Sequence, residues 1–77
     1  MRFIIYGAGA VGSIIGGHMY KANNDVLLIA NTHHVNIINK NGLELNTPDD
    51  KYILDIPAYN NISRIKSFKD DDVIFLT

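Results

Sequence analysis

Three glycines near the N-terminus, Gly7, Gly9 and Gly12, constrain the fold of this chain more than any other feature. They follow an apolar run at residues 3–6 that is too short for a helix, and a helix-compatible pattern restarts at Ala10. This Gly-x-Gly-x-x-Gly spacing between a strand and a helix is typical of a dinucleotide-binding turn. The first glycine permits a sharp turn, the second leaves room for a pyrophosphate, and the third lets the helix pack against the strand. The N–H groups and the positive dipole end of the helix favour a diphosphate.

The composition is that of an ordinary globular chain, with 77 residues, 47% hydrophobic, 19% charged and a net charge of −1. This balance predicts neither a nucleic-acid surface nor a membrane-binding surface. The chain has no cysteine, which excludes disulfides and thiolate metal sites and favours a cytoplasmic location. We expect no metal site. Residues 1–17 superficially resemble a signal peptide, but five glycines between positions 7 and 17 make a poor apolar segment, and no run is long enough to span a membrane.

The first 30 residues predict a strand, a helix and a second strand. The strand covers Arg2–Tyr6 and is apolar enough to be buried on both faces of a parallel sheet. The helix covers about residues 10–22, and its apolar stripe predicts the residues that face the sheet: Val11, Ile15, Met19 and Ala22. Beside this stripe, Gly12 and Gly16 allow a close helix–strand approach. A turn at residues 23–24 leads into a second strand at 26–30, which completes a βαβ unit.

A second helix follows the second strand. Either Asn31 or Thr32 can cap its start, and it runs to about Asn41, with Val35 and Ile38 facing the core. Gly42 can adopt the left-handed conformation that ends a helix.

The apolar pattern then changes to a period of two. Residues 43–45 alternate, residues 52–56 resume strand character, and Thr47-Pro48-Asp49-Asp50 between them is typical of a turn, so we expect an antiparallel hairpin. Residues 57–69 are predicted to be irregular, with Ile62 and Ile65 as apolar anchors.

The last residues predict a charged turn and a strand. Asp70-Asp71-Asp72 is expected to be a solvated turn rather than a metal site, and residues 73–77 another short buried strand. Because no helix follows to cover that strand, we expect residues 1–77 to be the N-terminal part of a longer protein.

The end of the second strand bears on the choice of cofactor. In dinucleotide-binding folds an acidic residue there binds the ribose 2′-hydroxyl of NAD, whereas a basic residue accommodates the 2′-phosphate of NADP. Residues 29–34, Ile-Ala-Asn-Thr-His-His, contain no carboxylate. This weakens the case for NAD and FAD and leaves room for a 2′-phosphate near Asn31, Thr32 and one or both of His33 and His34. Exposed positions in the first helical turn are the alternative for the two histidines.

Several segments together resemble the ketopantoate reductases (2-dehydropantoate 2-reductases). Residues 5–12, Ile-Tyr-Gly-Ala-Gly-Ala-Val-Gly, resemble the opening motif of that family, and residues 25–30 resemble its second strand. His34 and the Asn-Gly-Leu-Glu-Leu of residues 41–45 are similar to the next stretch of the family pattern. Residues 72–77 resemble the strand that leads to a family lysine just past Thr77. The resemblance covers essentially the whole chain.

The resemblance implies an α/β, Rossmann-type doubly wound sheet and an NADPH-dependent reduction of 2-dehydropantoate to pantoate, in pantothenate and coenzyme A biosynthesis. A lysine in a second, helical domain would support the developing alkoxide, so no catalytic residue is expected within residues 1–77, and the segment alone is expected to be inactive. A small 2-keto acid is the expected substrate, and a homodimer is compatible with the family. The cofactor-binding residues that we expect are Gly7, Ala8, Gly9, Ala10, Val11, Gly12, Asn31 and Thr32.

The sequence departs from the family pattern at one position, and two other functions remain as alternatives. The family commonly carries arginine where Asn31 stands, so NAD is an alternative to NADP. The main rival function is another NAD(P)-dependent hydroxy-acid dehydrogenase, and a second is a non-enzymatic nucleotide-sensing domain, although such domains usually have an acidic residue at the end of the second strand. A P-loop NTPase is excluded, since no Gly-Lys-Ser/Thr follows the glycines.

Overall fold

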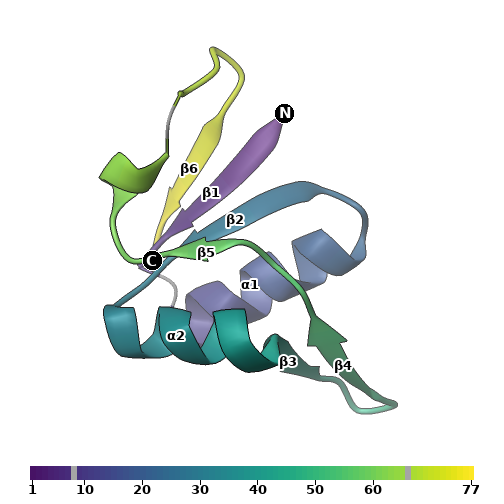
Figure 1. The fold of residues 1–77 in the computed structure, drawn as a ribbon. Coiled ribbons are helices and arrows are strands. Elements are labelled where there is room, and N and C mark those ends of the chain that lie inside the picture. The colour runs from purple at the N-terminus through teal and green to yellow at the C-terminus, as the bar shows by residue number, and fades with distance from the viewer. Residues whose placement is uncertain (8, 66) are drawn as a thin grey trace.

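The structure is a computed structural model that describes residues 1–7, 9–65 and 67–77 (Figure 1). The elements in chain order are β1 (Arg2–Tyr6), α1 (Ala10–Lys21), β2 (Asp25–Ile29), α2 (Thr32–Asn41), β3 (Leu43–Asn46), β4 (Lys51–Leu54), β5 (Ala58–Tyr59), the 3₁₀ turn η1 (Ile62–Arg64) and β6 (Val73–Leu76). The predicted bounds of β1, α1, β2 and α2 are confirmed to within one residue.

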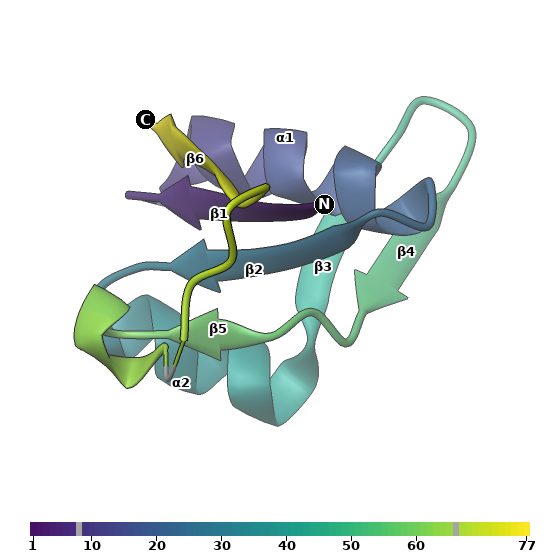
Figure 2. The ribbon, with the colours of Figure 1, turned by 90° about the horizontal axis from the view of Figure 1, so that it is seen from above.

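A parallel sheet in the order β5-β2-β1-β6 forms the centre of the molecule. Figure 2 shows these strands side by side with α1 and α2 behind them. Ile5 and Leu28 share a core cluster with residues of α2, whereas Ile4 and Leu27 pack on the opposite face with Ile65. Burial on both faces explains why β1 and β2 are continuous apolar runs rather than alternating ones. The strand order, with the third and fourth parallel strands on either side of the first pair, is that of the Rossmann fold and confirms the predicted fold class.

The predicted packing face of α1 is wrong. The buried residues of this helix are Gly12, Ser13, Gly16 and Gly17, while Val11 and Ile15 are 67% and 39% exposed and Ala22 is also exposed. Of the predicted stripe, only Met19 packs against the core, and only in part. The reason is volume: Ile5, Val26 and Leu28 fill the space above the sheet, so the helix presents its smallest residues to them.

The second helix and the hairpin agree with expectation. Asn31 is the N-cap of α2, and its Oδ1 accepts the His34 backbone N–H at 2.8 Å. At the other end Gly42 has a φ of 83°, a conformation that favours glycine. β3 and β4 then pair antiparallel in a separate sheet. The hairpin packs its apolar side under α1, where Leu43 and Leu45 meet Gly17.

Two predictions for residues 57–77 need correction. Within the segment predicted to be irregular, β5 is a short strand that pairs with β2, because Pro57 O and Tyr59 O accept backbone N–H groups of Leu28 and Ala30. The predicted burial of β6 is wrong for the described chain, since Ile74, Phe75 and Leu76 are all exposed. The strand lies at the sheet edge with β1 as its only described strand neighbour. The expectation that Ile62 and Ile65 anchor the intervening loop is confirmed. Ile65 is buried in the core cluster on that face of the sheet, and Ile62 packs against this cluster.

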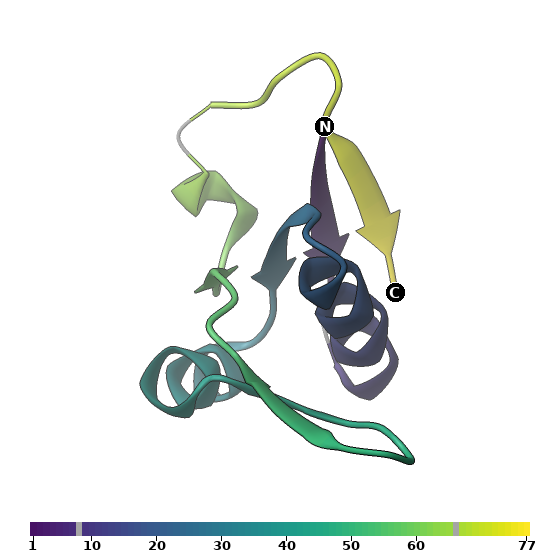
Figure 3. The ribbon, with the colours of Figure 1, turned by 90° about the vertical axis from the view of Figure 1, so that its right-hand side faces the viewer.

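The charged turn before β6 has a role that the sequence did not reveal. Arg2 donates from Nη2 to Asp72 Oδ2 at 2.7 Å and from Nε to Oδ1 at 3.2 Å, and Asp72 is only 5% exposed. These bonds, together with the Lys69 backbone N–H, hold the pKa of Asp72 below its usual value. The pair joins Arg2, the first residue of β1, to Asp72, which immediately precedes β6, and so sets the start of the strand pairing that ends at the glycine turn. Figure 3 shows the starts of the first and last strands of the chain near each other.

Candidate functional site

The glycine turn lies where the order of the strands reverses. β1 is followed along the chain by β2 on one side, but its neighbour on the other side is β6, which comes last. In open α/β sheets, ligands bind outside the carboxyl ends of the strands at such a switch point. The turn is held to both neighbours: Gly7 N–H donates to Ile29 O at 3.0 Å, and Thr77 N–H donates to Tyr6 O at 3.0 Å.

The three glycines of the motif have different surroundings. Gly7 has a φ of 83°, and a Cβ added to it would lie 2.7 Å from Thr77 O. A Cβ on Gly12 would lie 2.7 Å from Thr77 Oγ1 and 3.2 Å from Ile5 Cγ2. Gly9 differs, because its φ is −80° and no atom of residues 1–7, 9–65 and 67–77 lies within 4 Å of an added Cβ. The fold therefore requires glycine at positions 7 and 12, whereas position 9 opens onto empty space.

The start of α1 is suited to an anion. Gly9 is the N-cap and offers no side-chain cap, and no acidic residue lies in the first turn. The Gly9 N–H donates to Gly7 O at 2.7 Å, and the first helical bond runs from Ser13 N–H to Gly9 O at 2.9 Å. By helix geometry, the N–H groups of residues 10–12 have no acceptor within the helix. Free N–H groups at a helix start, together with the helix dipole, favour an anion such as a diphosphate.

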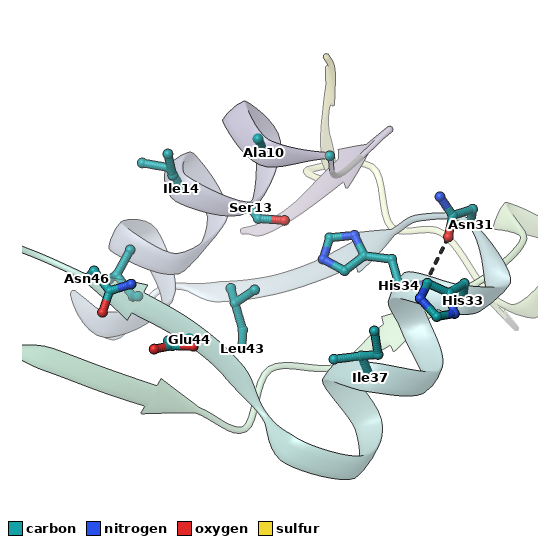
Figure 4. Close-up of a pocket in the computed structure, with 12 residues that line it drawn as sticks. Ala10, Ser13, Ile14, Asn31, His33, His34, Ile37, Leu43, Glu44 and Asn46 are labelled. Atoms are coloured by element: carbon teal, nitrogen blue, oxygen red, sulfur yellow. Dashed lines mark hydrogen bonds between the residues drawn. The ribbon is translucent and has the colours of Figure 1, made fainter.

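A cleft of about 550 Å³ extends from this helix start. Figure 4 shows it between α1, the first turns of α2 and β3, with the His34 ring extending into it toward Ser13. The polar residues that line it include Ser13, Asn31, His33, His34 and Glu44. Apolar side chains of α1, α2 and β3 form the remaining walls. The cleft thus joins the end of β2 to the start of α1, which are the two places where dinucleotide-binding folds contact a ribose 2′ group and a pyrophosphate.

The predicted site residues fall into three groups. Gly9, Ala10 and Asn31 line the cleft, and Val11 is exposed at the start of α1. Gly7 and Gly12 form the turn itself. Thr32 does not line the cleft, and its Oγ1 accepts the Asn60 side-chain amide at 3.2 Å. Ala8, also predicted, lies outside the described residues.

Two residues join the site that were not predicted to do so. Ser13 is buried on the cleft side of α1, one residue beyond the motif. Thr77 reaches the turn from β6, where its Oγ1 donates to Gly7 O at 2.6 Å. The sequence feature that could have identified Thr77 is its position at the carboxyl end of a predicted strand. The carboxyl ends of parallel strands meet at one edge of the sheet.

Over residues 1–7, 9–65 and 67–77, no cluster of histidine and acidic side chains has the arrangement of a metal site. Within the same part of the chain, no helix has the length and apolar character needed to cross a membrane.

Comparison with known proteins agrees with this geometry. The chain is 35% identical over 83 aligned positions to a 2-dehydropantoate 2-reductase of Pyrococcus abyssi, covering 90% of this chain and 28% of that protein. A solved PanE/ApbA family ketopantoate reductase from Ralstonia eutropha superposes with a TM-score of 0.86 at 33% identity, covering 99% of this chain and 24% of that one. D-mandelate dehydrogenase, solved with NADH and anilino(oxo)acetate, has a TM-score of 0.77 at 32% identity, with coverage of 100% and 24%.

The chain thus spans about a quarter of the length of these relatives. The model of one protein family, described as ketopantoate reductase PanE/ApbA, matches residues 3–77, which is nearly the whole sequence. The chain belongs to the ketopantoate reductase PanE/ApbA family.

Proposed function

We propose that this chain is the cofactor-binding part of an NADPH-dependent 2-dehydropantoate 2-reductase, which reduces ketopantoate to pantoate in pantothenate and coenzyme A biosynthesis. Residues 1–77 form the N-terminal part of its dinucleotide-binding domain, and a separate helical domain supplies the catalytic groups. Family membership and the curated relatives named 2-dehydropantoate 2-reductase support this proposal. On this proposal, residues 1–77 alone bind cofactor without turning over substrate.

The open space at Gly9 is the observation that carries the proposal. Gly7 and Gly12 are glycines for reasons internal to the fold, since a side chain at either would meet Thr77. In the part of the chain that the structure describes, no atom lies within 4 Å of a Cβ added at Gly9. Glycine at this position is therefore explained by a ligand that approaches the backbone, as the pyrophosphate of a dinucleotide does at this turn.

Different residues of the described chain hold different parts of such a cofactor. The N–H groups at the start of α1 bind the pyrophosphate, and Asn31 at the end of β2 lies where the adenosine ribose is read. When bound, NADPH supplies the hydride that reduces a keto carbon to an alcohol. The contribution of this chain is to hold the dinucleotide in one place, so that its nicotinamide has a defined position relative to the substrate.

The preference for NADP over NAD depends on the environment of Asn31. Its Oδ1 already accepts the His34 N–H, so the side chain can offer a 2′-phosphate only its Nδ2 donors. His34 lines the same cleft and can add a donor or, when protonated, a positive charge. No carboxylate occurs at residues 29–34 to repel a 2′-phosphate.

A second candidate is an NAD-dependent dehydrogenase of another 2-hydroxy acid. Its support is the likeness to D-mandelate dehydrogenase, a protein solved with NADH, at 32% identity over the whole chain. The absence of a positive charge at Asn31 also favours this alternative. Both candidates use the same turn and differ in the preferred cofactor and in the keto acid reduced.

The test is a substitution at Gly9 in the full-length protein. Gly9→Val should abolish binding of NADPH and NADH in calorimetry and leave the circular dichroism spectrum unchanged, because the added side chain fills only the ligand's space. Gly17→Ala is the matched control, since Gly17 lies further along α1 and the atoms nearest to an added Cβ belong to Leu43 and Leu45, at 3.4 Å. Unchanged affinity in Gly9→Val would contradict nucleotide binding at this turn. Turnover of ketopantoate compared with an aryl 2-keto acid separates the two candidates.

A further inference from the structure

We infer that Thr77 is a positioning residue for cofactor binding, and that its hydroxyl holds the glycine turn in the shape that accepts the pyrophosphate. The inference rests on the proposed function, since it assumes that the turn binds a dinucleotide. Thr77 follows β6 and comes from the opposite end of the chain to the residues that it contacts.

The Thr77 side chain lies between the two ends of the turn. Its Oγ1 donates to Gly7 O at 2.6 Å, with Tyr6 O within reach at 3.2 Å. The same oxygen would lie 2.7 Å from a Cβ on Gly12, so it is close to the first turn of α1. One hydroxyl therefore bonds to the residue that begins the turn and lies beside the residue that ends it.

The Gly7 carbonyl is held from two directions. Gly9 N–H donates to it at 2.7 Å from the helix side, and Thr77 Oγ1 donates to it at 2.6 Å from β6. Gly7 has a φ of 83° and, being glycine, a wide choice of backbone conformations. Without the Thr77 hydroxyl, the Gly9 bond would be the one hydrogen bond among the described residues that fixes the orientation of this carbonyl.

The position of Thr77 is itself set by the sheet. β6 pairs with β1 from Phe3↔Val73 to Tyr6↔Leu76, and Thr77 N–H continues the ladder to Tyr6 O. At the other end of the pairing, Arg2 and Asp72 join the two strands. A register held at both ends places the Thr77 hydroxyl at the turn. Ordering the turn before the ligand arrives reduces the entropy lost on binding.

Two substitutions separate the hydroxyl from the rest of the side chain. Thr77→Val keeps the shape and removes the donor, whereas Thr77→Ser keeps the donor and removes the methyl group. Val73→Ala is the control, since it weakens the packing of β6 without touching the turn. Each full-length variant is measured for NADPH affinity by calorimetry, for melting temperature, and for the KM values of NADPH and ketopantoate.

Thr77→Val should bind NADPH about three- to tenfold more weakly, the usual effect of one lost hydrogen bond. Its KM for NADPH should rise while its KM for ketopantoate stays constant, and Thr77→Ser should retain the affinity of the unmodified protein. Val73→Ala should lower the melting temperature and leave NADPH affinity unchanged. If Thr77→Val does not fold, Thr77→Ala takes its place with the same expectations.

Three results would overturn the inference: unchanged affinity in Thr77→Val, an equal loss in Val73→Ala, or an equal loss in Thr77→Ser. The second would reduce Thr77 to a structural role, and the third would assign the effect to the methyl group. If the unmodified protein binds neither NADPH nor NADH, the proposed function fails, and this inference fails with it.

Discussion

Gly16 of α1 lies directly against Leu28 of β2, and a Cβ added to Gly16 would come within 2.8 Å of Leu28 Cδ2 and 3.2 Å of Ile5 Cγ1. Both sheet residues are fully buried and have little room to move. A Cβ on the neighbouring Gly17 would instead lie 3.4 Å from the side chains of Leu43 and Leu45, which is an ordinary contact. The close approach of Gly16 to Leu28 brings α1 near enough to the sheet for the first turn of the helix to meet the carboxyl end of β1.

The two adjacent glycines therefore predict opposite effects on stability. Gly17→Ala should raise the free energy of unfolding by up to about 1 kcal/mol, because alanine favours the helix and fits the space. Gly16→Ala should lower it by about 1–3 kcal/mol, because the added methyl overpacks the core. Urea denaturation of the two variants checks this pair. Equal changes would contradict the close approach at Gly16, since the gain in helix propensity is the same at both positions.

Substitutions at Asn31 should change the choice of cofactor. Asn31→Asp keeps the cap of α2 and places a carboxylate at the end of β2, so the ratio of NADH to NADPH affinity should rise about tenfold or more. Asn31→Arg should shift the ratio toward NADPH, but with a loss of about 1 kcal/mol in stability, since arginine cannot cap the helix.

Asn31→Ala is the control for these variants, because it loses the same cap without adding charge. Calorimetry with both cofactors gives the ratio of the NADH and NADPH affinities. Urea denaturation gives the free energy of unfolding that is lost with the cap. An unchanged ratio in both the aspartate and the arginine variants would place the ribose away from Asn31.

The ion pair between Arg2 and Asp72 predicts a dependence of stability on pH. The Arg2 guanidinium and the Lys69 backbone N–H lower the pKa of Asp72 in the folded state. The stabilisation is therefore complete above the usual carboxyl pKa of about 4 and is lost as the pH falls through the lower folded pKa. Asp72→Asn should be less stable than the unmodified protein at neutral pH, and the difference should disappear in acid.

Asp71→Asn provides the comparison for this pH series. Asp71 pairs with the N-terminal amine at 3.2 Å, but both groups are 58% exposed. Exposed pairs contribute at most about 1 kcal/mol, so this variant should differ little from the unmodified protein at any pH. A loss in Asp71→Asn as large as that in Asp72→Asn would show that general charge, rather than the contact with Arg2, causes the effect.

Local chemistry in the sequence determined where the elements begin and end. The bounds of β1 and α2, the stop at Gly42 and the hairpin after it follow from residues a few positions apart, and the structure confirms them. Of the two caps that the sequence offered, Asn31 and Thr32, the structure has Asn31. The glycine spacing likewise predicted the strand–turn–helix unit. The atoms that exclude a side chain at Gly7 and Gly12, however, include those of the distant Thr77.

The tertiary structure decided the properties that depend on distant partners. The face that α1 turns to the sheet depends on how much volume the strands occupy, so Gly16 rather than Ile15 meets the core. The exposure of β6 depends on its edge position, and the strand β5 depends on the backbone groups of β2. The contact of Thr77 with Gly7 joins residues 70 positions apart, and only the parallel pairing of β1 and β6 brings them together.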